Sequence, residues 1–241
     1  MLVAAAVCPH PPVLVPEMAG EAAPELDAVR AACDRAVERL AGAGALFVVG
    51  GGAETRLYGP GAYASLRPYG FDWTSPAEPE NGAEELPLSL TIGRWLLERQ
   101  GLAAGARYQA VASDADPDAC LKLGQELAKA RGDVALLVMG DGSACRSAKA
   151  PGYLDVRARP YDEGVARALG DADTAALAAL DPVLSQEVQA AGRAAWQVLA
   201  GAADAAAGGA AGLTGELLAD EAPYGVGYFV AAWSRSGGRR G

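Results

Sequence analysis

Histidine is the residue that this sequence most nearly lacks. The 241-residue chain contains one, His10, within the stretch VCPHPPVLVPE at residues 7–17. A site built from two or more imidazoles, as in many metal centres, is therefore excluded. Any further metal ligand or proton acceptor has to be a carboxylate, a thiol or a hydroxyl group.

Cysteines and long apolar runs are scarce as well. The four cysteines are widely spaced and form no C-x-x-C pair, which argues against a structural zinc site or a disulfide framework and indicates a reducing compartment. No stretch approaches the roughly 20 apolar residues that span a bilayer. The apolar run at residues 2–7 follows no basic segment and stops at prolines, unlike a signal peptide. We therefore expect a cytoplasmic protein without membrane contacts.

Positive charge is in deficit. The chain has 20 Lys and Arg against 30 Asp and Glu, a formal net charge of −10, and such a field repels nucleic-acid phosphates. We expect no nucleic-acid partner. The hydrophobic share of 51% and the charged share of 21% are those of an ordinary globular protein, and the length suits one large α/β domain.

Apolar runs of strand length alternate with segments of helical spacing. The runs lie at residues 1–8, 45–52, 106–113 and 133–140, and the helical segments at 21–44, 87–101, 116–132 and 161–204. A last strand is predicted at 225–233. This alternation predicts a single α/β domain, residues 1–234, with a mostly parallel central sheet and helices on both faces. Residues 235–241 are predicted to be a disordered tail.

Candidate functional residues follow the ends of these predicted strands. His10 follows the first, Gly51 and Gly52 end the second, and Asp141 follows the run at 133–140. Ligands of open α/β sheets bind at this edge. Prolines hold His10 on a rigid loop, so its ring is either a metal ligand or general base, or a histidine satisfied by a backbone carbonyl.

The stretch MGDGSACRSAK suggests an anion-binding loop. The backbone of Gly142, together with that of Gly51 and Gly52, and the side chains of Arg146 and Lys149 are candidates for holding a carboxylate or phosphate. Asp141 and Ser143 are candidates for positioning a water or a substrate hydroxyl, although no G-x-S-x-G motif surrounds Ser143. The alternative interpretation of this stretch is a tight turn with solvated basic residues.

Two further residue types near the predicted edge carry chemistry. In APYGVGYFVAAW, Tyr224 is a candidate whose hydroxyl reaches the edge, whereas Tyr228, Phe229 and Trp233 are expected to fill the core or a subunit contact. Cys8 lies two residues before His10. A Cys–His nucleophile pair is conceivable there, but we favour a buried apolar cysteine.

The chain resembles the B-type domain of class III extradiol ring-cleavage dioxygenases, a superfamily that includes Memo-like proteins. The resemblance lies in four stretches, which occur in the order CPHPPVLVPE, LFVVGGG, VMGDGSA and DEAPYGVGYFVA. More narrowly, the chain is similar to a group of actinobacterial proteins that share this B-type extradiol dioxygenase domain. The resemblance implies a single α/β domain that holds Fe(II) with two histidines and one carboxylate, plus a further histidine as acid/base. His10 stands where the first ligand belongs.

The sequence departs from that family at the other histidine positions. The second-ligand stretch reads VVGGGAETRLYG and the acid/base stretch GDGSACR, and neither contains histidine. Two carboxylates would complete a metal site with His10. One is Glu54, and the other is Glu216, Asp220 or Glu221, of which we take Glu221. This oxygen-rich set favours harder divalent ions. We expect no metal cofactor, with Fe(II) or another divalent metal as the alternative that the resemblance implies.

Three functions stay open at this point. The chain is a diverged family member with a degenerate metal site that binds an anionic or aromatic small molecule, an active metal-dependent dioxygenase with non-standard ligands, or a non-catalytic subunit or interaction protein. We favour the first and third over the second. The expected partners are a small-molecule ligand and, by resemblance, a second protomer in a homodimer or hetero-oligomer.

Overall fold

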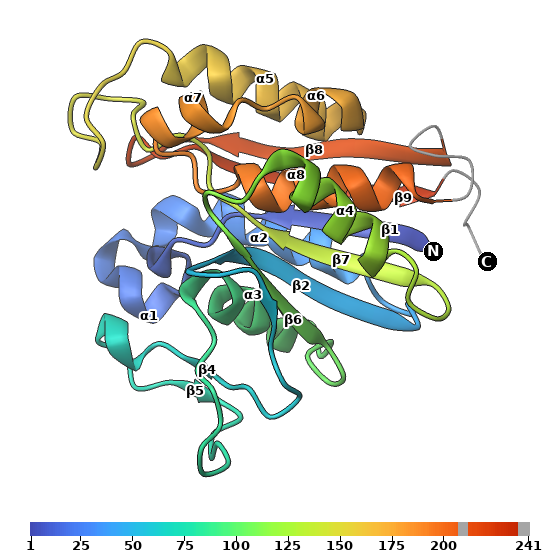
Figure 1. Ribbon diagram of the computed structural model, residues 1–241. Helices are drawn as coiled ribbons and strands as arrows, with labels where there is room; N and C mark the ends of the chain where they lie inside the picture. Colours follow the sequence, from blue (N-terminus) through green and yellow to red (C-terminus); the bar gives the residue numbers. More distant parts are fainter. Residues whose placement is uncertain (207–211, 236–241) are drawn as a thin grey trace.

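A seven-stranded sheet crosses the molecule in the order β3-β6-β2-β7-β1-β9-β8 (Figure 1). The computed structural model describes residues 1–206 and 212–235. The strands are β1 (Leu2–Cys8), β2 (Ala45–Gly52), β3 (Arg56–Leu57), β6 (Arg107–Ala112), β7 (Val134–Met139), β8 (Leu213–Glu221) and β9 (Tyr228–Arg235).

The four strands in the middle of the sheet are parallel. β7 pairs with β2 on one side and β1 on the other, and β6 pairs with β2. All six residues of β7 are buried, as expected for a continuous apolar run covered on both faces. The predicted strands at 1–8, 45–52, 106–113 and 133–140 are confirmed to within one residue at each end.

The far end of the sheet is antiparallel, which the sequence analysis missed. β9 pairs antiparallel with β1, and β8 pairs antiparallel with β9 as the last strand of the sheet. β8 has one buried residue among nine and carries Glu216, Asp220 and Glu221, so it lacks the apolar pattern of a buried strand. Arg235, predicted to begin the tail, ends β9, and residues 236–241 lie outside the described residues.

Helices cover both faces of the sheet, as predicted. α2 (Asp27–Glu38) and α3 (Leu88–Arg99) lie on one face of the sheet, in the same hydrophobic core as Val48 and Leu137. Phe47 and Leu136 point to the opposite face and belong to the other hydrophobic core. Figure 1 shows α4 and α8 in front of the sheet and α2 and α3 behind it. The remaining helices are α1 (Pro16–Ala19), α4 (Pro117–Leu127), α5 (Ala158–Asp171), α6 (Thr174–Ala178), α7 (Pro182–Glu187) and α8 (Arg193–Asp204).

Two helix starts follow from local chemistry. Asp116 caps α4 by accepting hydrogen bonds from the N–H groups of Asp118 and Ala119, as the Asp-Pro sequence predicts. α2 begins later than the helical segment predicted at 21–44. Residues Gly20–Leu26 form a 3-10 helix that contains Pro24, and the α-helix begins at Asp27.

α4 and α8 cross with their backbones in contact. A Cβ atom added at Gly124 of α4 would lie 2.0 Å from the carbonyl oxygen of Val198, and one added at Gly201 of α8 would lie 2.0 Å from that of Leu121. Any side chain at either position would push the helices apart. The two glycines therefore set the spacing of the helix layer that covers the ends of β6 and β2.

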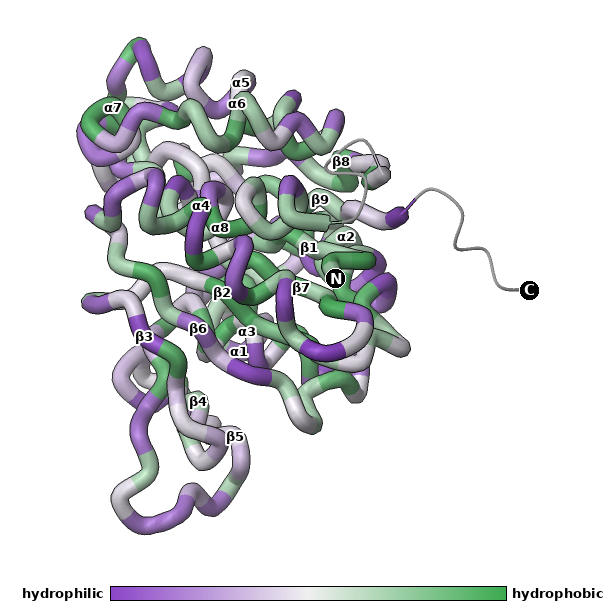
Figure 2. Tube along the Cα trace, turned by 45° about the vertical axis from the view of Figure 1, so that its right-hand side comes forward, coloured by the Kyte–Doolittle hydropathy of each residue, from purple (hydrophilic) through white to green (hydrophobic). Residues whose placement is uncertain are grey.

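The segment after β2 is a long excursion. It contains β3, a separate two-stranded sheet of β4 (Ala64–Ser65) and β5 (Thr74–Ser75), and a 3-10 turn at Arg67–Tyr69. Figure 2 shows hydrophobic residues concentrated on the central strands and hydrophilic residues along much of this excursion. None of the helices in the described part of the chain has the length and hydropathy that a membrane span needs.

Candidate functional site

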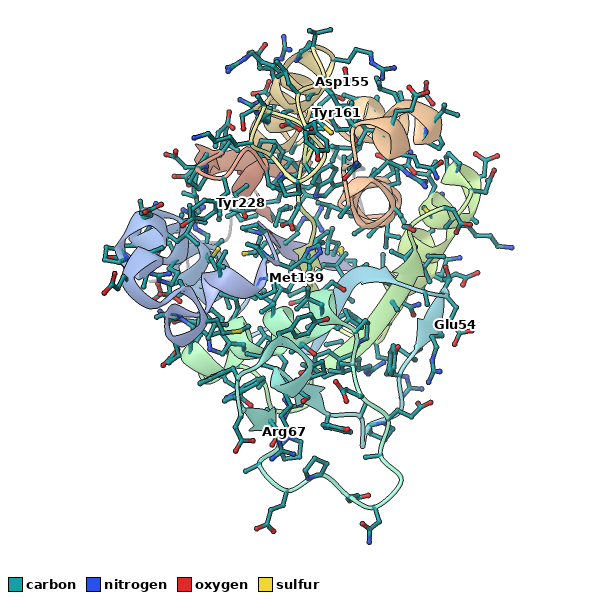
Figure 3. The ribbon with its side chains drawn as sticks, turned by 90° about the vertical axis from the view of Figure 1, so that its left-hand side faces the viewer. Glu54, Arg67, Met139, Asp155, Tyr161 and Tyr228 are labelled. Atoms are coloured by element: carbon teal, nitrogen blue, oxygen red, sulfur yellow. The ribbon has the colours of Figure 1, made fainter. Side chains whose placement is uncertain are left out.

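The carboxyl ends of β1 and β7 lie side by side at one edge of the sheet. Cys8 at the end of β1 lies opposite Met139 at the end of β7, and the chain leaves them toward opposite faces, to α2 and α5 respectively. Neighbouring parallel strands whose connections diverge leave a crevice at this edge, which is where α/β proteins bind ligands. Figure 3 looks onto this edge, with Met139 near the centre of the view.

His10 and Asp141 meet in this crevice although they are 131 residues apart in the chain. The backbone N–H of His10 donates to Oδ1 of Asp141 at 2.8 Å, and the imidazole Nδ1 lies 3.8 Å from the same oxygen. The side chains are 12% and 15% exposed. The imidazole and the carboxylate therefore lie together, where both can form hydrogen bonds with a bound hydroxyl group.

Two tyrosines extend the polar group beside His10. Tyr228 is the first residue of β9, the strand that pairs with β1, and it lies near enough to Asp141 to feel its charge. Burial, and secondarily the negative charge of Asp141, raises the pKa of Tyr228. Burial and then the nearby Glu25 carboxylate raise the pKa of Tyr224, although its hydroxyl makes no hydrogen bond of normal geometry. Both phenols therefore stay protonated and can donate.

Buried polar atoms without partners gather at this edge. Four buried side-chain nitrogen or oxygen atoms in the described chain lack a hydrogen-bond partner: His10 Nδ1, Arg146 Nε, Trp196 Nε1 and Tyr224 Oη. Trp196 belongs to the same region, because a Cβ added at Gly140 would lie 2.9 Å from its Nε1. More than nine in ten buried polar groups in native proteins are satisfied, so a cluster of exceptions indicates a place where water or a ligand binds.

The two glycine-containing stretches at the edge pair with each other. The N–H of Gly142 donates to the carbonyl of Gly227 at 2.7 Å, and the N–H of Arg146 donates to that of Gly225 at 3.0 Å. A Cβ at Gly142 would come within 3.0 Å of Phe229 and Asp162. Close packing around Asp162 explains these glycines, so Gly142 is held in a backbone ladder and does not form an open anion-binding loop.

Arg146 is bound to a buried carboxylate, and its role in binding an anion stays a prediction. Its Nη1 lies 2.9 Å from Oδ2 of Asp162, whose side chain is fully buried. Ser143 donates its backbone N–H to the other Asp162 oxygen at 2.8 Å. Its own hydroxyl is buried and accepts a hydrogen bond from the N–H of Cys145, so it does not face a substrate. Lys149 is exposed on the same loop.

Asp162 is the residue at this edge that the sequence analysis missed. It lies in α5, and its spacing to Val165, Ala166 and Leu169 places it on the buried face of that helix. A carboxylate within an apolar helical stripe was the available signal, since a charged residue is seldom fully buried unless it is paired. Burial raises the pKa of Asp162, and the hydrogen bonds from Ser143 and Arg146 oppose that shift.

The predicted metal ligands do not come together. Among the described residues, no group of three or more His, Cys, Asp or Glu side chains is placed to hold a metal ion. Glu54 pairs with Arg56 at 3.2 Å and lies at the margin of Figure 3, away from Met139. Glu216 pairs with Arg39 at 2.6 Å. The residues around His10, with one imidazole and no second histidine, do not fit the two-histidine iron centre that the family resemblance implies.

The remaining sequence candidates serve packing. Gly51 accepts a hydrogen bond on its carbonyl from Ser89 Oγ at 2.6 Å, and a Cβ at Gly52 would lie 2.8 Å from that of Ala110. Cys8 is fully buried, and burial followed by the neighbouring Cys33 raises the pKa of its thiol. A protonated, inaccessible thiol is no nucleophile, so the Cys8–His10 pair is not supported.

Comparisons with known proteins bear on the fold and not on the function. No family model matches the chain, and no curated protein matches it. Among solved structures, the chain is similar to the uncharacterized protein JW3007 from Escherichia coli K12, with a TM-score of 0.59 and 13% identity over 96% of this chain and 99% of that one. At this identity the likeness shows a shared single-domain α/β fold.

Proposed function

We propose that the chain is a small-molecule-binding protein with the fold of the B-type extradiol dioxygenase domain and a degenerate metal site. Its ligand binds in the crevice between β1 and β7. The observation that carries this proposal is the group of buried polar atoms without partners, of which His10 Nδ1 follows β1 and Tyr224 Oη precedes the neighbouring strand β9. A ligand with hydroxyl groups would supply the missing partners.

The charges around the crevice favour a neutral hydroxylated ring over an anion. Arg146, the nearest basic side chain that the sequence offered for an anion, is neutralised by Asp162. Asp141 adds a carboxylate beside His10. The half-buried Tyr224 supplies an aromatic ring and a phenol donor. Of the two ligand classes expected from the sequence, the aromatic one is therefore better supported.

The dioxygenase alternative has weaker support. His10 and Asp141 offer one nitrogen and one carboxylate, and Glu54 is paired elsewhere with Arg56. Because these residues do not fit the iron centre, we route no chemical step through a metal. What the crevice offers is a place where the His10–Asp141 pair can hold a ligand hydroxyl through hydrogen bonds.

Phenol and catechol are expected to stabilise the protein in thermal unfolding. At a hundredfold excess over Kd, a ligand adds about 2.7 kcal/mol, which raises the Tm of a chain of this length by roughly 5–10 °C. Chelator treatment should leave the shift unchanged. His10→Ala should abolish it by removing the imidazole, whereas Lys122→Ala, at an exposed position on α4, should retain it.

Anisole, which lacks the hydroxyl hydrogen, serves as the matched probe and should give a much smaller shift. The proposal fails if neither hydroxylated ring stabilises the protein, or if His10→Ala responds as the unsubstituted chain does. A response that disappears with chelator would favour the dioxygenase alternative.

A second candidate function, an interaction protein, is favoured by an exposed apolar tip. Tyr153, Leu154 and Val156, between β7 and α5, are 75%, 60% and 83% exposed. The tip is held in place, because the N–H of Asp155 donates to the carbonyl of Cys145 at 3.0 Å. Ordered apolar groups in solvent are typical of contact sites. If this function holds, light scattering should show a dimer that Val156→Asp converts to a monomer, and a monomeric unsubstituted chain would argue against self-association.

A further inference from the structure

A pocket lies at the end of β6. Its volume is about 340 Å³, and its lining includes Ser113, Val183, Gln186, Gln189 and Arg193. The pocket and the crevice are neighbours, because the N–H of Gly192 donates to the carbonyl oxygen of Asp141 at 2.9 Å. A volume of this size is at the lower end of the range for small-molecule sites.

Arg193 is a buried cation without a carboxylate partner. The residue is 2% exposed, and its guanidinium donates to the carbonyls of Ser113 and Ala115, each at 2.6 Å, and to Oε1 of Gln197 at 2.9 Å. The other two well-buried arginines, Arg30 and Arg146, each pair with an aspartate. Among the described residues, no carboxylate lies within ion-pair distance of Arg193.

The backbone around Arg193 adds potential of the same sign. Arg193 is the first residue of the twelve-residue helix α8, and no side chain caps that helix at Gly192. A helix N-terminus carries partial positive charge and disfavours a cation. Asp114 is the one carboxylate that lines the pocket, and it is exposed and not paired with Arg193. The carbonyl oxygens satisfy hydrogen bonds of Arg193 but leave its charge uncompensated.

We propose that this pocket binds the carboxylate group of a small organic acid. The anion would compensate Arg193 and the start of α8. The apolar lining, which includes Pro182, Val183, Ala190 and Ala191, would pack against a short apolar or aromatic body. The site is separate from the crevice at His10 and does not depend on the function proposed there. It also gives the chain an anion site in place of the one expected at Arg146.

Benzoate and its neutral isostere benzamide are suitable probes in calorimetric titrations. Benzoate should bind at least about tenfold more tightly than benzamide, and its affinity should fall as salt is raised. Val183 is 63% exposed and lines the pocket, so its substitution does not disturb the core. Val183→Asp should weaken benzoate binding about tenfold by repulsion at the pocket mouth. Asparagine has the shape of aspartate without its charge, so the benzoate affinity of Val183→Asn should stay within about twofold of that of the unsubstituted chain.

His10→Ala separates this site from the crevice. Benzoate affinity should be unchanged in that variant, whether or not the crevice binds a phenol. Equal binding of benzoate and benzamide, equal affinities in Val183→Asp and Val183→Asn, or loss of benzoate binding in His10→Ala would each overturn the proposal. In the last case benzoate would be a ligand of the crevice.

Discussion

Replacing Arg146 with methionine is expected to lower the free energy of unfolding by about 3–5 kcal/mol, a large part of the 5–15 kcal/mol typical of a domain. The substitution keeps much of the side-chain volume but removes the ion pair at 2.9 Å. The fully buried Asp162 carboxylate would keep only the N–H of Ser143 as a donor. An unpaired buried charge is among the few single defects with an effect of this size.

The loss should depend on pH in a defined direction. Burial already raises the pKa of Asp162, and Arg146 opposes that shift, so the substitution raises the pKa further. A carboxyl group whose pKa is higher in the folded state stabilises the fold when protonated, and this contribution is lost as the pH rises through that pKa. The destabilisation should therefore be largest near neutral pH and smaller at about pH 4.5.

Urea unfolding of Arg146→Met at the two pH values measures both effects. Arg157→Met is the matched control, because Arg157 also pairs with an aspartate, Asp155, but is half exposed. Exposed ion pairs contribute little, so the control should unfold close to the unsubstituted chain. Equal losses in the two variants, or a loss for Arg146→Met that is independent of pH, would contradict the role given to Asp162.

Alanine at Gly124 or Gly201 is expected to destabilise the protein by about 3 kcal/mol, at the upper end of the effect of overpacking. Each new Cβ would lie 2.0 Å from a backbone oxygen of the opposing helix, and a backbone atom cannot rotate away. α4 and α8 would have to separate, with a fall in Tm of roughly 6–12 °C.

Gly164→Ala in α5 is the control for the effect of alanine on helix propensity. A Cβ there meets nothing within 4 Å, so the substitution should stabilise the helix by about 0.5–1 kcal/mol. Calorimetric unfolding of the three variants compares these values. If alanine at Gly124 or Gly201 raises the Tm as Gly164→Ala does, the contact between the two helices is looser than described.

The sequence was sufficient to predict the framework and the position of the candidate site. The apolar runs of β1, β2, β6 and β7 are buried on both faces, so their composition alone marks them as strands, and their ends place His10 and Asp141 at one edge. β8 could not be predicted in the same way. As an edge strand with one buried residue, it exposes its charged side chains.

The side-chain partners at the site could not be predicted, for a common reason. Arg146 stands in a glycine-containing loop with Lys149, and local sequence suggests a cation free to bind an anion. Its partner Asp162 belongs to a helix whose packing is decided by tertiary structure. For Arg193, the alanine-rich sequence around it does not indicate a buried charge. Its burial results from the packing of α8 against the loop at Ser113, which only the structure shows.

The position of β1 has a consequence for how the chain reaches its native state. β1 is the first strand of the chain, yet its two neighbours, β7 and β9, begin at Val134 and Tyr228. During synthesis both edges of this apolar strand stay unpaired until β7 has been made. The edge that pairs with β9 stays unpaired until β9 is complete. Closure of the sheet therefore waits for contacts of very large sequence separation, which slow folding. Until then, the segment that leads into His10 is the part of the nascent chain most exposed to aggregation.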